Sequence, residues 1–158
     1  MNEQFFRKAL HGQEAHVDTA TVFDGLDWRQ AGEKATGFPH SVWELLFHVN
    51  YWQDFMLDLL NGDTPKSQNP DAESWPASPS PESEEEWDSA VAYFLKGLKE
   101  AEQEGGKDLT EQVVAGRGET RAECLQTIVL HNSYHAGQVV FARKIMGDWL
   151  PVTSGDKG

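Results

Sequence analysis

The sequence contains one cysteine, few basic residues and no long apolar run, and each shortage excludes a class of protein. The single cysteine, Cys124, cannot form an internal disulfide, which fits a reducing compartment. Only 13 Lys and Arg oppose 26 Asp and Glu, so the formal net charge is −13. This charge repels phosphate groups, and we therefore expect no nucleic-acid partner.

Signals for a membrane or for export are also lacking. No apolar segment approaches the ~20 residues that a membrane-spanning helix needs. The N-terminal residues show no basic region followed by an apolar one, so no signal peptide is expected. These features predict a cytoplasmic protein with no membrane partner. A chain of 158 residues with 39% hydrophobic side chains can bury one core, so residues 1–158 are expected to form a single domain.

Apolar residues recur at helical spacing in four segments. The predicted helices cover residues 3–24, 41–61, 81–103 and 120–147. The second and fourth each begin with a capping box, Ser41 to Glu44 and Thr120 to Glu123, in which the two side chains bond free backbone N–H groups. Four amphipathic helices of this length predict an all-α fold, a four-helix bundle.

The connection between the second and third predicted helices is long and rich in proline. Five of the seven prolines lie in residues 62–81, which are expected to contain no helix. Ser80 and Pro81 at its end fit an N-cap and a first-turn proline for the third helix. Gly147 and Pro151 mark the end of the fourth helix. The sequence thus predicts a Pro-rich crossover that runs from one end of the bundle to the other.

The fourth predicted helix carries two histidines, His131 and His135, four residues apart. Side chains at this spacing share one helix face, and two imidazoles placed in this way can reach one transition metal ion. Both lie on the apolar stripe that is expected to face the core, where an unpartnered imidazole is costly because it loses water. The pair is not the HExxH motif of metalloproteases, because Asn132 stands in place of the catalytic glutamate.

His48 is the candidate third ligand. It lies between Leu45 and Trp52 on the predicted inner face of the second helix. Taken alone, such a histidine is more often a hydrogen-bonded core residue than a metal ligand. Three histidines on the inner faces of two helices favour a metal site, and the predicted ligands are His48, His131 and His135.

Two segments resemble the DinB-like metalloprotein family, whose wider superfamily includes YfiT-like proteins and thiol-dependent S-transferases. They are residues 41–52 (SVWELLFHVNYW) and 131–138 (HNSYHAGQ). The family pattern has one histidine in the second helix and an H-x3-H pair in the fourth, followed by a small residue and glutamine. Ala136 stands where many relatives have arginine, so no role of that arginine is transferred.

The resemblance implies a cofactor and a partner. Relatives are described as four-helix bundles, often homodimers, that bind a divalent metal ion such as nickel or zinc. We therefore expect nickel or zinc at His48, His131 and His135, and a homodimer. Several members transfer low-molecular-weight thiols, so a small thiol or an electrophile is the expected small-molecule partner.

The remaining histidines and the cysteine are weaker candidates. His16 lies on the stripe of the first predicted helix and could point toward the site, but an outer or core position is the better interpretation. His11 and His40 are expected at the surface. Cys124 precedes His131 by seven residues, about 10 Å along the helix, and is expected to be a buried structural thiol.

Three neutral imidazoles leave a divalent cation its charge and an open position, where the pKa of bound water is lowered and a bound thiol is deprotonated. The sequence therefore predicts a metal-dependent enzyme that activates a small thiol, as an S-transferase, or water, as a hydrolase. No catalytic residue is assigned, because no inward carboxylate stands out. The alternatives are a non-catalytic metal-binding stress or interaction protein, and a metal-free bundle with structural histidines. The acidic segment 71–104, with ten acids and two lysines, supports an interaction protein.

Overall fold

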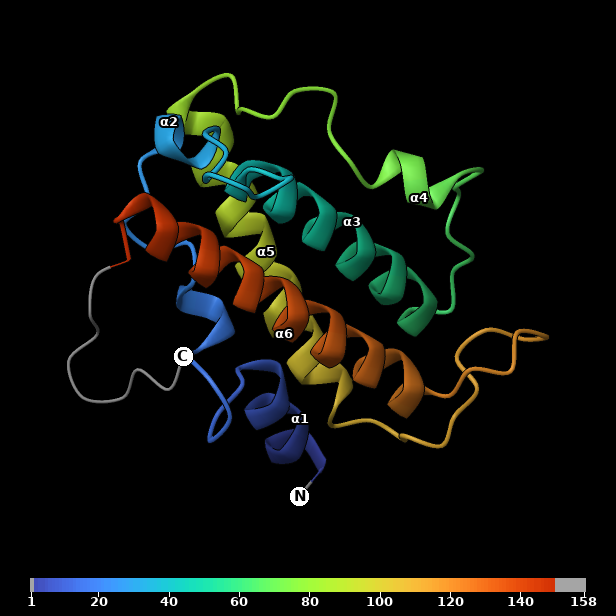
Figure 1. Cartoon of the computed structure of the whole chain (residues 1–158). Coiled ribbons are helices and arrows are strands. Elements are labelled where there is room, and N and C mark those ends of the chain that lie inside the picture. Colours follow the sequence, from blue (N-terminus) through green and yellow to red (C-terminus); the bar gives the residue numbers. More distant parts are fainter. Residues whose placement is uncertain (1, 150–158) are drawn as a thin grey trace.

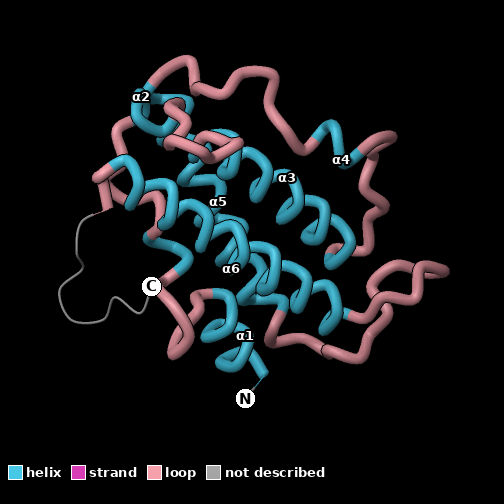
Figure 2. The backbone as a smooth tube through the Cα atoms, viewed as in Figure 1, coloured by secondary structure: helices cyan, strands magenta, loops and turns pink. Residues whose placement is uncertain are grey.

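The computed structural model describes residues 2–149, and these residues form helices and loops without a named strand (Figures 1 and 2). The elements are α1 (Asn2–Leu10), a 3-10 turn (Thr19–Thr21), α2 (Trp28–Ala31), α3 (Val42–Leu60), α4 (Pro70–Glu73), α5 (Glu84–Glu104) and α6 (Arg121–Met146). In this part of the chain, no helix combines the length and apolarity needed to cross a membrane. The all-α prediction is confirmed.

α3, α5 and α6 form the bundle together with the shorter α1. α3 packs against both α5 and α6, and α1 packs against the same two helices. Figure 1 shows α3 and α5 running in the same direction and α6 running opposite to them. Two parallel helices that follow one another need a connection that returns along the whole bundle. Residues 61–83 form this crossover, as the long proline-rich connection predicts.

Both predicted capping boxes are confirmed. Ser41 accepts a hydrogen bond from the backbone N–H of Glu44, and the Glu44 side chain accepts one from the backbone N–H of Ser41. Thr120 and Glu123 make the same reciprocal pair at the start of α6. α3 and α6 therefore begin within one residue of the predicted positions. Gly147 is the C-cap of α6, whereas Pro151 lies outside the described residues.

The expected helix over residues 3–24 is wrong beyond Leu10. Gly12 has a left-handed φ of +66°, and a Cβ on it would lie 2.1 Å from Cε1 of His16. This turn requires glycine and ends the helix, and Asp18 then caps the 3-10 turn. Val17 and Ala20 still pack on the core, Val17 from a loop and Ala20 from the 3-10 turn, which explains why both are apolar without a continuous helix.

The third predicted helix begins later than expected. Ser83, not Ser80, is the N-cap of α5, and its side chain accepts the backbone N–H of Glu86. Ser80 instead donates its hydroxyl to the backbone oxygen of Gly32 at 3.3 Å. Pro81 is a buried residue ahead of the helix.

The crossover contains one helical turn, which corrects the expectation that residues 62–81 hold no helix. α4 begins at Pro70, and Asn69 accepts the backbone N–H of Ala72 as its N-cap. Proline is tolerated at this first position because its missing N–H would have no helical partner. α4 positions the residues that follow it against α3.

Two buried arginines fasten the ends of α6. Arg121 donates to the last backbone oxygen of α3, on Leu60, at 3.2 Å and forms a buried ion pair with Glu104 of α5. Arg143 donates to the backbone oxygen of Val22 at 2.8 Å and to Asp148 at 2.9 Å. Each guanidinium has several acceptors, which compensates the loss of water on burial.

Two buried amide side chains fix the register of the three long helices. Gln53 of α3 donates Nε2 to the backbone oxygen of Phe94 in α5 at 3.0 Å, and Asn132 of α6 donates Nδ2 to Gln53 Oε1 at 2.9 Å. Gly97 makes room for this amide, because a Cβ at that position would lie 2.1 Å from Gln53 Nε2. A helix displaced by one turn would leave these groups buried without partners.

We expect Gly97→Ala to destabilise the fold by about 1–3 kcal/mol, although alanine is the better helix former, because the Gln53 amide loses its place. Gly137→Ala is the matched control. A Cβ on Gly137 meets nothing within 4 Å, so this change should stabilise by up to about 1 kcal/mol. Urea denaturation of both variants measures the difference, and equal effects would contradict the packing role of Gly97.

Candidate metal centre

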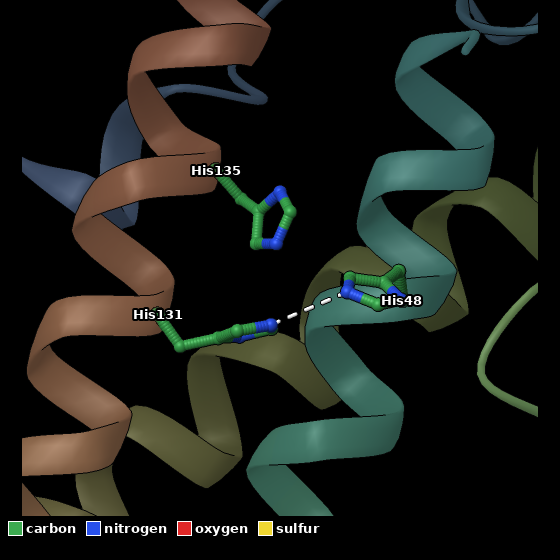
Figure 3. A group of neighbouring side chains, drawn as sticks. All are labelled: His48, His131 and His135. Carbon is green, nitrogen blue, oxygen red and sulfur yellow. Dashed lines mark hydrogen bonds between the residues drawn. The ribbon is translucent and has the colours of Figure 1, made fainter. Parts of the chain in front are cut away.

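Three histidines from two antiparallel helices meet at the centre of the bundle. His48 belongs to α3, and His131 and His135 occupy successive turns of α6, with their rings pointing toward one another (Figure 3). The Nε2 atoms of His48 and His131 are 3.3 Å apart. One nitrogen from each ring can be chosen so that all three lie within 4.8 Å of one another. A single metal ion fits such a group, with Zn–N distances of about 2.0–2.1 Å in known sites.

Burial keeps the three imidazoles neutral. Loss of water lowers the pKa of His48 to about 4, and the nearby His135 adds to this effect. Burial and the two neighbouring histidines lower the pKa of His131 to about 3. Burial lowers the pKa of His135 as well, although its bond to Gln138 opposes the shift. Metal ions coordinate the unprotonated nitrogen, so the site holds its ligands in the binding form at neutral pH.

Hydrogen bonds to the outer ring nitrogens orient two of the three ligands. Ser74 Oγ donates its proton to the backbone oxygen of Asp71, so it accepts the Nδ1–H of His48 at 3.1 Å. Gln138 Oε1 accepts the Nδ1–H of His135 at 2.6 Å. Both bonds place the lone pair on Nε2, the atom that faces the other rings. Such outer partners fix the tautomer of a metal-binding histidine.

His131 supplies the test of whether these residues fit a cation. Its Nε2 faces the Nε2 lone pair of His48 at 3.3 Å, and its buried Nδ1 makes no well-formed hydrogen bond. If Nδ1 carries the proton, the Nε2 lone pairs of His131 and His48 repel each other. If Nε2 carries the proton, it donates to His48, and Nδ1 is left as a buried acceptor without a well-placed donor. A cation among the three Nε2 atoms removes the lone-pair repulsion, and the residues therefore fit a metal ion.

Aromatic rings flank the histidines. The ring of Trp75, in the crossover, stacks on His48 on one face and on His40 on the other, with centroids 4.1 Å apart in both pairs. Trp52 lies beside His131, with centroids 6.4 Å apart. A cavity of about 30 Å³ reaches His131 between Trp52 and Asn132. This cavity is small, of the order of one water molecule.

The other predicted residues lie apart from this group. His16 does not point toward it: its Nδ1 donates to the backbone oxygen of Val17, and its Nε2 accepts the hydroxyl of Ser133 at 2.7 Å. Ser133 follows His131 by two positions, so it faces another side of α6. His40 stacks on Trp75 rather than joining the group, and its charge would act on His48 and His135 from a distance. Cys124 is buried, as predicted.

The surface position expected for His11 is wrong. This ring is half-buried, and its two nitrogens lie 2.7 Å from carboxylates of Asp18 and Glu102. Burial alone would lower the pKa of His11, but the two hydrogen bonds outweigh it and raise the pKa. His11 thus ties the segment after α1 to α5. The acids lie 7 and 91 residues away in the chain, too far for a helical pattern to reveal the contact.

Ser74, Trp75 and Gln53 also belong to this region, and none of them was predicted from the sequence. Ser74 and Trp75 come from a connection without periodicity, and only the folded crossover brings them to His48. Gln53 is one of several polar residues in the largely apolar α3, and its residue type gives no sign that it is buried. Gln138 could have been predicted from the sequence, because it follows His135 by three residues within the segment that carries the family resemblance.

A helical bundle with a largely buried three-histidine group between two of its helices defines the class of protein. The chain belongs to the DinB superfamily, whose sequence model matches residues 11–139. No curated protein and no solved structure matches the chain.

Each of the changes His48→Ala, His131→Ala and His135→Ala should weaken divalent-metal binding by more than the ~10–100-fold that loss of an outer partner costs. Ser74→Ala removes such an outer partner and should fall within that range. His16→Ala should bind as the unchanged protein does. Titration calorimetry with Ni²⁺ and Zn²⁺, with folding checked by circular dichroism, provides the measurement. Tight, stoichiometric binding by folded His48→Ala would exclude the three-histidine site.

In the presence of a chelator, acid should destabilise the protein through these histidines. Below pH ~6.5 these histidines become protonated in the unfolded chain but stay neutral in the folded chain. The free energy of unfolding therefore falls as the pH decreases toward the lowered pKa values of the folded state. For His131, whose pKa is lowered to about 3, the loss between pH 7 and 4 is about 3 kcal/mol.

His131→Leu should show a flatter dependence of unfolding free energy on pH. The difference between the two proteins, measured by urea denaturation at each pH, removes the contribution of other groups such as His11. Parallel curves for the two proteins would show that His131 is not held neutral by the fold.

Proposed function

We propose that this protein is a metal-dependent enzyme that transfers a small thiol to an electrophile, with His48, His131 and His135 holding a nickel or zinc ion. The observation that carries the proposal is the convergence of three neutral imidazoles, two buried and one partly buried, whose Nε2 atoms face one another. When bound, a divalent cation with an open position lowers the pKa of a water or thiol ligand. Membership of the DinB superfamily supports a metal at this place.

The surroundings of the histidines favour a thiol over water as the activated group. Glu104 is the one buried carboxylate among the described residues, and it pairs with Arg121 at the start of α6, ten residues before His131. Hydrolysis requires a group that gives a proton to the departing alcohol or amine. A thiol that loses its proton by ligation needs no separate base, and an electrophile with a halide leaving group needs no acid.

The side chains around the site have separable tasks in this proposal. Ser74 and Gln138 hold the rings of His48 and His135 with Nε2 directed inward. Trp75 and Trp52 exclude water, since the cavity beside His131 holds about one water molecule. Exclusion of water strengthens electrostatic interactions and protects a thiolate from protonation.

The test is a conjugation assay with the full chain loaded with Ni²⁺ or Zn²⁺. Cysteine, glutathione and coenzyme A are each incubated with 1-chloro-2,4-dinitrobenzene. The sulfur forms a bond to the ring carbon, chloride leaves, and the thiol proton passes to buffer. We expect a conjugation rate above that of chelator-treated protein for at least one thiol, and loss of this gain in His48→Ala. His16→Ala serves as a control that keeps the gain.

A parallel assay with p-nitrophenyl acetate measures hydrolysis. Metal-dependent hydrolysis without conjugation would overturn S-transfer in favour of the hydrolase. Tight metal binding with neither reaction would support the non-catalytic metal-binding protein, for which the small cavity and the lack of a nearby buried acid are the structural arguments.

A further inference from the structure

A serine of α6 and a histidine from the loop after α1 form a pair on another side of α6 from the three-histidine group. Ser133 Oγ lies 2.7 Å from Nε2 of His16. Nδ1 of His16 lies 2.7 Å from the backbone oxygen of Val17, which can only accept, so Nδ1 carries the proton of the neutral ring. Nε2 therefore accepts the Ser133 hydroxyl. A hydroxyl bonded to a base that a third group orients is the arrangement of an activated nucleophile.

The backbone of the loop after α1 holds the His16 ring in a defined position. The backbone N–H groups of Ala15 and His16 both donate to the carbonyl oxygen of Gly12 at 3.0 Å, and the ring lies where a Cβ of Gly12 would be. Glu14 has a φ of +71° and is the one residue other than glycine with a positive φ in the described part of the chain. Such unfavourable conformations persist where the surrounding structure requires them, and they are concentrated at functional sites.

The Ser133–His16 pair lines an open cavity of about 280 Å³. The other walls of this cavity are mainly apolar and include Val17, Val140 and Phe141. An apolar cavity of ~150 Å³ binds benzene, so this one has room for an aromatic ring or a short acyl chain. Apolar walls displace water from the group that is bound, and the remaining polar interactions are stronger without water. The cavity therefore suits an apolar group attached to a centre that Ser133 can attack.

Gly137 keeps the Ser133 hydroxyl accessible from this cavity. A helical side chain covers the turn that precedes its own Cα, so a side chain at position 137 would lie over Ser133, four residues earlier. Glycine is unfavourable in a helix interior, and a Cβ on Gly137 would meet nothing within 4 Å, so packing inside the chain does not require it. Access to Ser133 gives this glycine a function.

We propose that Ser133 is a nucleophile and His16 its general base, in a second site that hydrolyses activated esters whose acyl chain lies in the apolar cavity. Oγ of Ser133 forms a bond to the carbonyl carbon, its proton passes to Nε2 of His16, and the ester oxygen leaves and takes that proton. Water then attacks the acyl-serine and gives a proton to His16. The carboxylic acid leaves, and the proton returns to Ser133. No step involves a metal ion or the proposed thiol transfer.

The first test labels the chelator-treated full chain with phenylmethanesulfonyl fluoride, whose ring fits the cavity. Oγ of the serine forms a bond to sulfur, fluoride leaves, and the proton passes to the base. Mass spectrometry of peptides then locates the adduct. We expect Ser133 to react at least about 100-fold faster than Ser89, an exposed serine of α5 without a histidine partner, since general-base catalysis contributes about 10²–10⁴-fold. Equal labelling of the two serines would overturn the proposal.

The second test follows hydrolysis of p-nitrophenyl butyrate with chelator present, which makes the result independent of metal binding and thiol transfer. His16→Gln keeps an acceptor for the Ser133 hydroxyl but removes the base, so we expect the rate to fall about 100-fold. Ser133→Ala should abolish the reaction.

Gly137→Leu keeps both members of the pair but covers Ser133, and it should cause a loss similar to that of His16→Gln. Ser89→Ala is the matched control and should keep the full rate. Circular dichroism checks that each variant folds. An unchanged rate in folded His16→Gln or Ser133→Ala would contradict the nucleophile and show that the bond between them only ties the loop to α6.

Discussion

The three-histidine group depends on one buried polar contact that fixes the register of α3 against α6. Gln53 bonds to the backbone of Phe94 and accepts the amide of Asn132, and all three groups lie in an otherwise apolar interior. Apolar contacts between helices tolerate several registers, whereas the hydrogen bonds from Asn132 to Gln53 and from Gln53 to Phe94 form in only one. His131 is the neighbour of Asn132 in the chain, so the register in which these bonds form also brings His131 to within 3.3 Å of His48.

The three histidines act against the stability of the metal-free fold. Their rings lose water, and one nitrogen of His131 makes no well-formed hydrogen bond. The capping boxes, the buried arginines and the leucines of α3 supply the stability that tolerates this group. A metal ion that bound only the folded state would shift the folding equilibrium and offset this cost.

Sequence was sufficient where the determinant was local and insufficient where it depended on distant contacts. Ser41 with Glu44 and Thr120 with Glu123 are local signals, and they gave the starts of α3 and α6 within one residue. The spacing of His131 and His135 put both on one face for the same reason. The end of α1 depends on Gly12, where the ring of His16 fills the space that a Cβ would need. Ser83 rather than Ser80 caps α5, because the Ser80 hydroxyl is bonded to the backbone oxygen of Gly32. Helical periodicity contains no information about such contacts, nor about Ser74 and Trp75 meeting His48.

The crossover divides the properties of the site between two kinds of structure. The two long helices carry the three histidines, whereas the orienting hydroxyl of Ser74 and the covering ring of Trp75 belong to a connecting segment. A metal ion held by the histidines would depend on the helices for its ligand atoms and on the crossover for the orientation of His48. Insertions or deletions in residues 61–83 would therefore alter the site without changing any of the three histidines.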